Sequence, residues 1–153
     1  MPYNINDLLA HPGGQQQIEL TIAPSKPPFE IDGIRYLKEI QVEGRAFYQS
    51  DCAYFNVHII TIVEQRCSRC LAPLRVKVDN ADAWDIEVPP GETSVELERR
   101  VLSSIVFSLD PHPLCRPDCR GLCPVCGINL NEHPEHHCEK QDHERLTLKD
   151  FLE

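Results

Sequence analysis

The chain has 153 residues, of which 41% are hydrophobic, and its 24 acidic and 15 basic side chains leave a net charge of −9. This length allows one ordinary domain, or one domain with a small additional module. The acidic balance excludes attraction of a polyanion by overall charge, so a contact with RNA requires a local basic face or another protein. Residues 1–14 lack the regions of a signal peptide, and no apolar run approaches the roughly 20 residues that span a bilayer. We therefore expect a cytoplasmic protein with reduced thiols and no membrane contact.

The first two thirds of the chain predict a small antiparallel sheet. Alternating apolar residues predict, after a helical turn at Ile5–Ala10, strands at Gln16–Ile22, Glu39–Tyr48, Tyr54–Gln65, Leu74–Val78 and Trp84–Val88. The strand at Tyr54–Gln65 is expected at the centre of the sheet, because Ile60 and Ile62 make its second face partly apolar as well. Aromatic residues Tyr54, Phe55 and Trp84 are interpreted as core anchors.

A helix is predicted at Thr93–Leu109. Thr93 and Glu96 have the spacing of a capping box, and Asp110-Pro111 ends the pattern. Its apolar residues recur three and four positions apart: Leu97, Val101, Leu102, Ile105, Val106 and Leu109. Packing of this stripe on the sheet predicts an α+β domain at residues 1–110, a mostly antiparallel sheet covered by one main helix. Beyond it, only Leu146–Leu152 predicts a further short amphipathic segment.

Seven of the eight cysteines are clustered, and their spacing indicates metal binding. They form the Cys67 pair (Cys67 and Cys70), the Cys115 pair (Cys115 and Cys119), the Cys123 pair (Cys123 and Cys126) and the single Cys138. A C-x-x-C turn directs two thiolates at one ion, and in a reducing compartment this indicates structural zinc. Large apolar residues are few from Pro111 to Gln141, so zinc must stabilise a zinc-ribbon-like module at residues 111–153.

The sequence does not decide which of these residues share a metal ion. The Cys123 pair is completed either by Cys138 with His136 or His137, as in a ribbon, or by the upstream Cys115 pair. Seven cysteines and one histidine provide eight ligands, enough for two four-coordinate sites, in which the Cys67 pair joins the Cys115 pair. We therefore expect one zinc ion or two; the alternative for the Cys67 pair is two reduced thiols without metal.

Patterns of catalytic zinc do not fit the chain. A zinc deaminase needs H-x-E before P-C-x-x-C, whereas His133-Pro-Glu135 follows Cys126 here. The sequence also contains no H-E-x-x-H, phosphate-binding loop or G-x-S-x-G motif. We expect neither an enzyme nor a small-molecule substrate.

Several motifs together resemble the YceD family, bacterial large ribosomal RNA subunit accumulation proteins with plastid relatives. They are Ile5-Asn-Asp-Leu-Leu, Cys67-Ser-Arg-Cys70-Leu71, Leu109-Asp-Pro-His-Pro and the stretch from Pro113 to Asn131, PLCRPDCRGLCPVCGINLN. The resemblance implies a role in synthesis, processing or stability of large-subunit ribosomal RNA during ribosome assembly. Where many relatives carry C-x-C, this chain has His136-His-Cys138, so His136 is a candidate ligand in place of a thiolate.

The preferred hypothesis is a non-catalytic assembly factor whose ordered turns present arginines to ribosomal RNA. The candidates are Arg66, Arg69, Arg116 and Arg120, because a guanidinium binds phosphate through two hydrogen bonds; the same charges also suit the balancing of nearby thiolates. The alternatives are an acidic adaptor that binds a large-subunit ribosomal protein, and a thiol or zinc sensor that uses the Cys67 pair.

Overall fold

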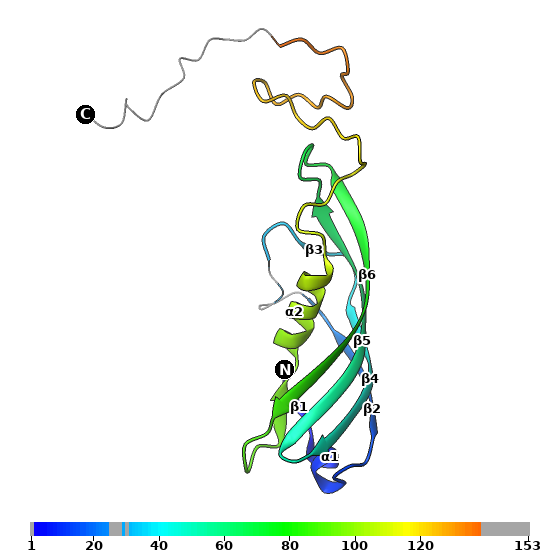
Figure 1. Cartoon of the computed structure of the whole chain (residues 1–153), viewed down its shortest axis with the longest axis vertical. Coiled ribbons are helices and arrows are strands. Elements are labelled where there is room, and N and C mark those ends of the chain that lie inside the picture. Colours follow the sequence, from blue (N-terminus) through cyan, green and yellow to red (C-terminus); the bar gives the residue numbers. More distant parts are fainter. Residues whose placement is uncertain (1, 25–28, 30, 139–153) are drawn as a thin grey trace, which may run out of the picture.

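The computed structural model describes residues 2–24, 29 and 31–138. The molecule is elongated: a long curved sheet with a helix on one face forms the body, and cysteine-rich loops form the opposite end (Figure 1). The predicted α+β class is confirmed, since the strands pair antiparallel and two helices accompany them. The amphipathic segment predicted at Leu146–Leu152 lies outside the described residues.

The main sheet is built around one central strand, as predicted. Strand β5 (Cys52–Arg66) pairs with β4 (Ile40–Gln49) along one edge and with β6 (Pro73–Glu87) along the other. Strand β2 (Gln16–Ile22) extends the sheet beyond β4, and the short β3 (Arg35–Tyr36) pairs with β5 past the end of β4. Alternate residues of β5, from Phe55 to Val63, are buried on one face.

Strand β6 corrects the prediction of two short strands, because it runs without interruption opposite β5. Asn80 and Asp82 occupy inward positions between Val78 and Trp84, and these polar residues interrupt the apolar alternation in the sequence. Both are accommodated by hydrogen bonds: Asn80 Nδ2 donates to Ser104 Oγ at 2.9 Å, and Trp84 Nε1 donates to Asp82 Oδ2 at 2.9 Å.

The predicted helix is shorter than its pattern. Helix α2 spans Glu98–Ser108. The predicted capping box is wrong, because no side-chain hydrogen bond caps the helix at its N-cap residue, Leu97. The three residues before it form β7 (Ser94–Glu96), which pairs with β1 (Pro2–Asn4) at the N-terminus. The residues predicted to form the first helical turn are therefore extended, because they pair with β1. The predicted N-terminal helical turn is confirmed as α1 (Asn6–Ala10).

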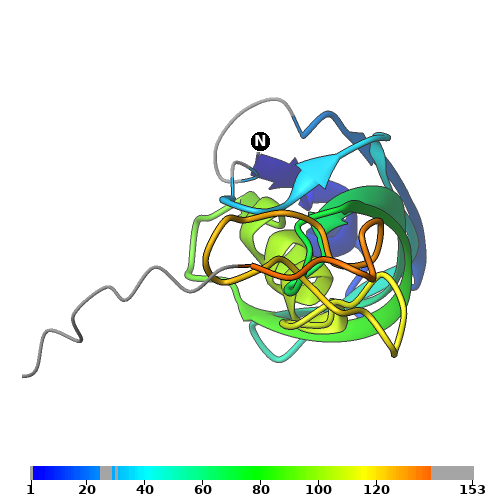
Figure 2. The same cartoon turned by 90° about the horizontal axis from the view of Figure 1, so that it is seen from above.

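The core lies between α2 and the concave face of the sheet, which curls around the helix (Figure 2). Leu97, Val101, Ile105 and Leu109 of the predicted stripe are buried, but Val106 is 36% exposed. Phe55 and Trp84 are core residues as predicted, whereas Tyr54 is only half-buried. Its ring stacks on Phe47 with centroids 4.8 Å apart, so it was wrongly interpreted as a core anchor.

Neither helix among the described residues has the length and apolar character that a membrane span requires.

Candidate metal centre

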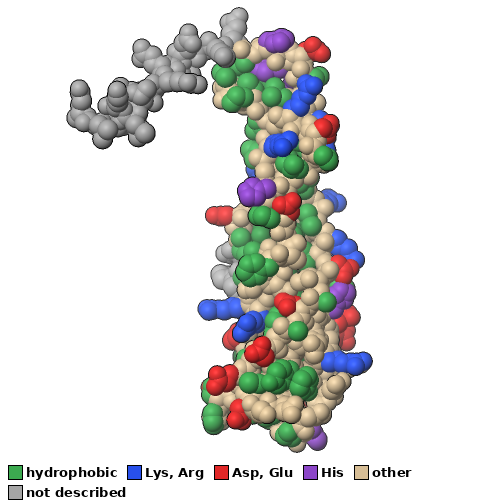
Figure 3. Space-filling view, in the orientation of Figure 1, with side chains coloured by type: hydrophobic (Ala, Val, Ile, Leu, Met, Phe, Trp, Pro, Cys, Tyr) green, Lys and Arg blue, Asp and Glu red, His purple; other side chains and the backbone are tan. Residues whose placement is uncertain are grey.

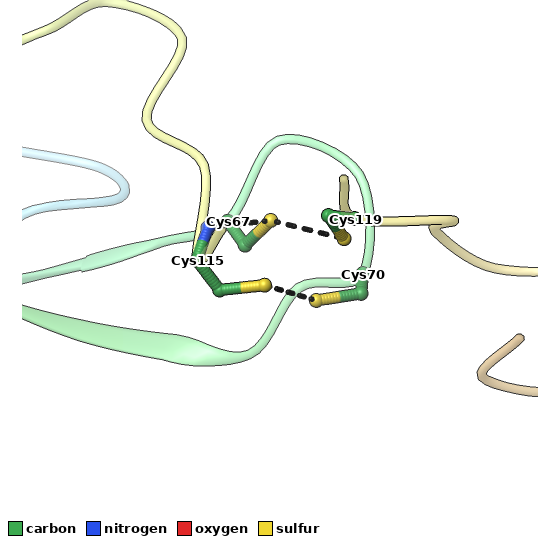
Figure 4. Close-up of side chains that lie close together, drawn as sticks. All are labelled: Cys67, Cys70, Cys115 and Cys119. Atoms are coloured by element: carbon green, nitrogen blue, oxygen red, sulfur yellow. Dashed lines mark hydrogen bonds between the residues drawn. The ribbon is translucent and has the colours of Figure 1, made fainter. Parts of the chain in front are cut away.

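The Cys67 pair lies in the turn that joins β5 to β6. Leu71 N donates to Cys67 O at 3.0 Å, Cys67 N donates to Ala72 O at 2.8 Å, and Leu71 adopts a φ of 61°. These contacts close the end of the long hairpin so that the sulfur atoms of Cys67 and Cys70 face the same space (Figure 4). The sheet therefore fixes two thiols at its far end.

The chain after α2 returns to this turn and brings the Cys115 pair against it. Ser68 N donates to Pro113 O at 2.8 Å, and Cys115 N donates to Cys67 Sγ at 3.4 Å. The sulfur atoms of Cys70 and Cys115 are 3.6 Å apart, and those of Cys67 and Cys119 are 3.9 Å apart. All four sulfur atoms lie within 4.8 Å of one another. We call these four residues the Cys67 group.

A second set of four ligand atoms lies further along the chain: Cys123, Cys126, His136 and Cys138, here the Cys123 group. These atoms also lie within 4.8 Å of one another. The turn that holds the first two closes through Cys123 N to Ile128 O at 2.8 Å and Gly127 N to Cys123 O at 2.9 Å. Cys126 Sγ lies 3.2 Å from His136 Nε2. His137 is exposed and outside the group.

Both groups could hold a metal ion, and their donor sets fit zinc. Four thiolates, or three thiolates with one imidazole, are the ligand sets of structural zinc, and a Zn–S bond of about 2.3 Å gives a tetrahedron with edges of about 3.8 Å. The short sulfur–sulfur distances in the Cys67 group, 3.6 and 3.9 Å, agree with such an edge. Of the arrangements left open by the sequence, the structure assembles the paired one with eight ligands.

The pKa values of the thiols differ within each group. The backbone N–H of Cys70 is the largest influence that lowers the pKa of Cys67, to about 6. The N–H of Cys126 does the same for Cys123, whose pKa is also about 6. Burial first, and then neighbouring sulfur atoms, raise the pKa of Cys115 to about 12 and that of Cys138 to about 11. Each group thus combines a thiol of lowered pKa with one of raised pKa, and a bound cation would stabilise the ionised form of all its cysteines.

The four candidate arginines are exposed at this end of the molecule, and three of them make internal contacts. The guanidinium of Arg69 donates to Cys119 O at 2.9 Å, and that of Arg120 donates to Pro134 O at 3.3 Å. Arg116 donates to Asn131 Oδ1 at 2.8 Å and lies 3.5 Å from Asp118. Arg66 is the last residue of β5 and is exposed. Their contact with RNA stays a prediction.

One residue that contacts the candidate ligands was missed by the sequence analysis, which included Asn131 only as the end of the stretch from Pro113 and gave it no role. Its Nδ2 donates to Cys119 Sγ at 3.3 Å. This bond helps to hold the pKa of Cys119 below its usual value against burial, which acts in the opposite direction. An asparagine shortly after a cysteine cluster was the available signal.

Residues 79–152 match the model of a family described as "Large ribosomal RNA subunit accumulation protein YceD". The resemblance that the motifs predicted is thereby confirmed over this range. The matched range contains six of the eight ligands in the two groups, since the Cys67 pair precedes it.

Individual proteins are also similar to this chain. Uncharacterized proteins of Mycobacterium bovis and Mycobacterium tuberculosis are 26% identical over 168 residues, which cover 99% of this chain and 81% of the relative. A maize protein named "Large ribosomal RNA subunit accumulation protein YCED homolog 1, chloroplastic" is 26% identical over 66 residues, or 42% of this chain and 22% of the relative. No solved structure matches the chain significantly.

Proposed function

We propose that this protein is a non-catalytic cytoplasmic factor that supports synthesis, processing or stability of large-subunit ribosomal RNA during ribosome assembly. The match of residues 79–152 to a family named for accumulation of this RNA supports the proposal. In it, the Cys67 and Cys123 groups each hold one zinc ion as a structural element. Residues 1–110 and 111–153 are then two units joined by the Cys67 group, which takes two ligands from each.

The donor sets favour a structural role over catalysis. A catalytic zinc keeps a coordination position open for water or substrate, whereas four protein ligands close the tetrahedron. Each of the two groups supplies four protein ligands. The ions would therefore stabilise the loops around them, and binding to RNA or protein would be the activity.

The distribution of charge supports a contact with RNA at the metal end, defined as residues 66–72 and 111–138. This end carries four basic and three acidic side chains, whereas the other described residues, the body, carry seven basic and fifteen acidic ones. Acidic side chains occur along the length of the body on the face shown in Figure 3. Phosphates are repelled by the body, so the arginines of the metal end are the preferred site for RNA.

Substitution of Arg66 tests this proposal, because it is the candidate arginine whose side chain forms no hydrogen bond within the described part of the chain. We expect Arg66→Gln to weaken binding to large-subunit ribosomal RNA and to reduce the slope of log K against log [salt] by about 1, as for one lost phosphate contact. Arg45→Gln, at an exposed position of β4 in the body, is the matched control and should leave the slope unchanged. Equal slopes for all three proteins would reject RNA contact through Arg66.

The excess of acidic side chains on the body favours a second candidate, an adaptor that binds a basic large-subunit ribosomal protein. Such a complex would survive nuclease treatment during purification and weaken at high salt. Loss of the partner after nuclease treatment would instead indicate an association through RNA.

A further inference from the structure

The side chain of Asn131 contacts the Cys67 group and uses its full hydrogen-bonding capacity. Nδ2 donates to Cys119 Sγ at 3.3 Å and to Asn129 Oδ1 at 2.9 Å. Oδ1 accepts from Arg120 N at 2.9 Å and from Arg116 Nη2 at 2.8 Å. A backbone amide and a guanidinium are donors only, so a flipped amide would lose these bonds, and the orientation of Asn131 is fixed by its neighbours.

The position of Asn131 depends on the turn that carries the Cys123 group. Leu130 N donates to Gly121 O at 2.9 Å, Leu122 and Asn129 form a β-bridge, and Cys123 N donates to Ile128 O at 2.8 Å. These bonds form a small hairpin with Cys123 and Cys126 toward its tip and Asn131 at its base. A metal ion in the Cys123 group would hold this hairpin in place and thereby keep Asn131 beside Cys119.

We propose that Asn131 couples the two groups, so that an ion in the Cys123 group raises the affinity of the Cys67 group for its own ion. The inference rests on the metal binding proposed above. An N–H bond to a ligating sulfur orients the ligand and stabilises its charge, and loss of such an outer contact typically reduces metal affinity about 10-fold to 100-fold. Coupling of equilibrium affinities is reciprocal, so an ion in the Cys67 group must raise the affinity of the Cys123 group by the same factor.

Titration of the full chain with Co²⁺ alone tests the coupling, because absorption spectra distinguish a four-thiolate site from one with three thiolates and an imidazole. The key variant is Asn131→Asp, which keeps the acceptor for Arg116 and Arg120 but loses the donor to Cys119. We expect the affinity of the four-thiolate site to fall at least about 10-fold. Asn129→Asp is the matched control: it loses a donor to Glu132, at 2.7 Å, and none to sulfur, so both affinities should be retained.

Two double variants measure the coupling without changing Asn131. Cys123→Ser with Cys126→Ser should weaken Co²⁺ binding by the Cys67 group about 10-fold, and Cys67→Ser with Cys70→Ser should weaken binding by the Cys123 group equally. Two bound ions with affinities that none of these variants changes in the intact group would overturn the coupling and leave the metal sites standing. Equal losses in Asn131→Asp and Asn129→Asp would also overturn it. A wild-type chain that binds no Co²⁺ would overturn the coupling and the proposed metal sites together.

Discussion

The body buries twenty hydrophobic residues in one continuous core. The buried cluster at the metal end consists of three cysteines, against which only Ala72, Leu122 and Leu74 of β6 pack. Burial of apolar area stabilises a fold by roughly 25 cal/mol per Å². The body has enough such area to hold a sheet and a helix together. The loops of the metal end bury little that is apolar, so a bound ion would supply stability that burial does not.

The two regions nevertheless depend on each other at the Cys67 group. Its first two thiols lie in the turn of the β5–β6 hairpin, and the other two lie on the chain that follows α2. The sheet thus fixes half of the candidate site in advance. This would lower the entropy that residues 111–138, the tail, lose if they bind the same ion. The Cys123 group has no such support from the body, since all four of its ligands come from residues 123–138.

Removal of metal should produce the largest difference in stability between the two regions. We expect a chelator to abolish protection from hydrogen exchange in residues 111–138 while β4, β5 and α2 remain protected, because apparent zinc binding energies of about 10–16 kcal/mol per site are lost. Hydrogen exchange with and without chelator, alongside circular dichroism, measures this. Protection of the metal end that persists in demonstrably metal-free protein would contradict the comparison.

A cavity in the core should instead destabilise the body and leave the metal end unchanged. Phe55 is 1% exposed, and its replacement in Phe55→Ala should lower the free energy of unfolding of the body by about 3–5 kcal/mol, as judged by urea denaturation. The metal content of the folded variant should not change. Phe107→Ala is the control, because Phe107 is 88% exposed and its loss should alter stability by no more than about 0.5 kcal/mol. Loss of metal in the folded Phe55→Ala protein would show that packing of the core, and not only the position of the β5–β6 turn, determines metal binding.

The sequence predicted those parts of the fold where one local pattern decides the outcome. Strand β2 has the predicted bounds, and β5 is central because both of its faces are partly apolar. The start of α2 was wrong because Ser94–Glu96 pairs with residues at the far N-terminus, a contact that no local spacing records. The break in β6 was wrong because Asn80 and Asp82 obtain partners from α2 and from Trp84, which hydrophobic periodicity does not reveal.

The candidate site was likewise predicted where local spacing decides the outcome, and missed where distant segments meet. Spacing within each C-x-x-C identified the ligands, because two sulfurs on one turn are a local feature. The partnership between the Cys67 and Cys115 pairs depends on where α2 returns the chain to the hairpin, so spacing left it open. The role of Asn131 was invisible to sequence analysis, because its contact with Cys119 joins two different turns.

The smallest expected effect concerns the close contact between the tail and the β5–β6 turn, and alanine substitutions of two glycines test it. Gly121 and Gly127 have nearly equal positive φ angles, 77° and 76°, so alanine at either position should cost about 1–2 kcal/mol in backbone strain. A Cβ at Gly121 would lie 3.0 Å from Arg69 O, which accepts a hydrogen bond from Leu122 N, whereas a Cβ at Gly127 would meet no atom within 4 Å. The Gly121→Ala variant should therefore weaken metal binding by the Cys67 group more than Gly127→Ala does, in chelator competition of the two proteins. The backbone strain is common to both variants and cancels in this comparison. Equal losses of metal affinity would therefore mean that the close contact between the tail and the turn is not needed.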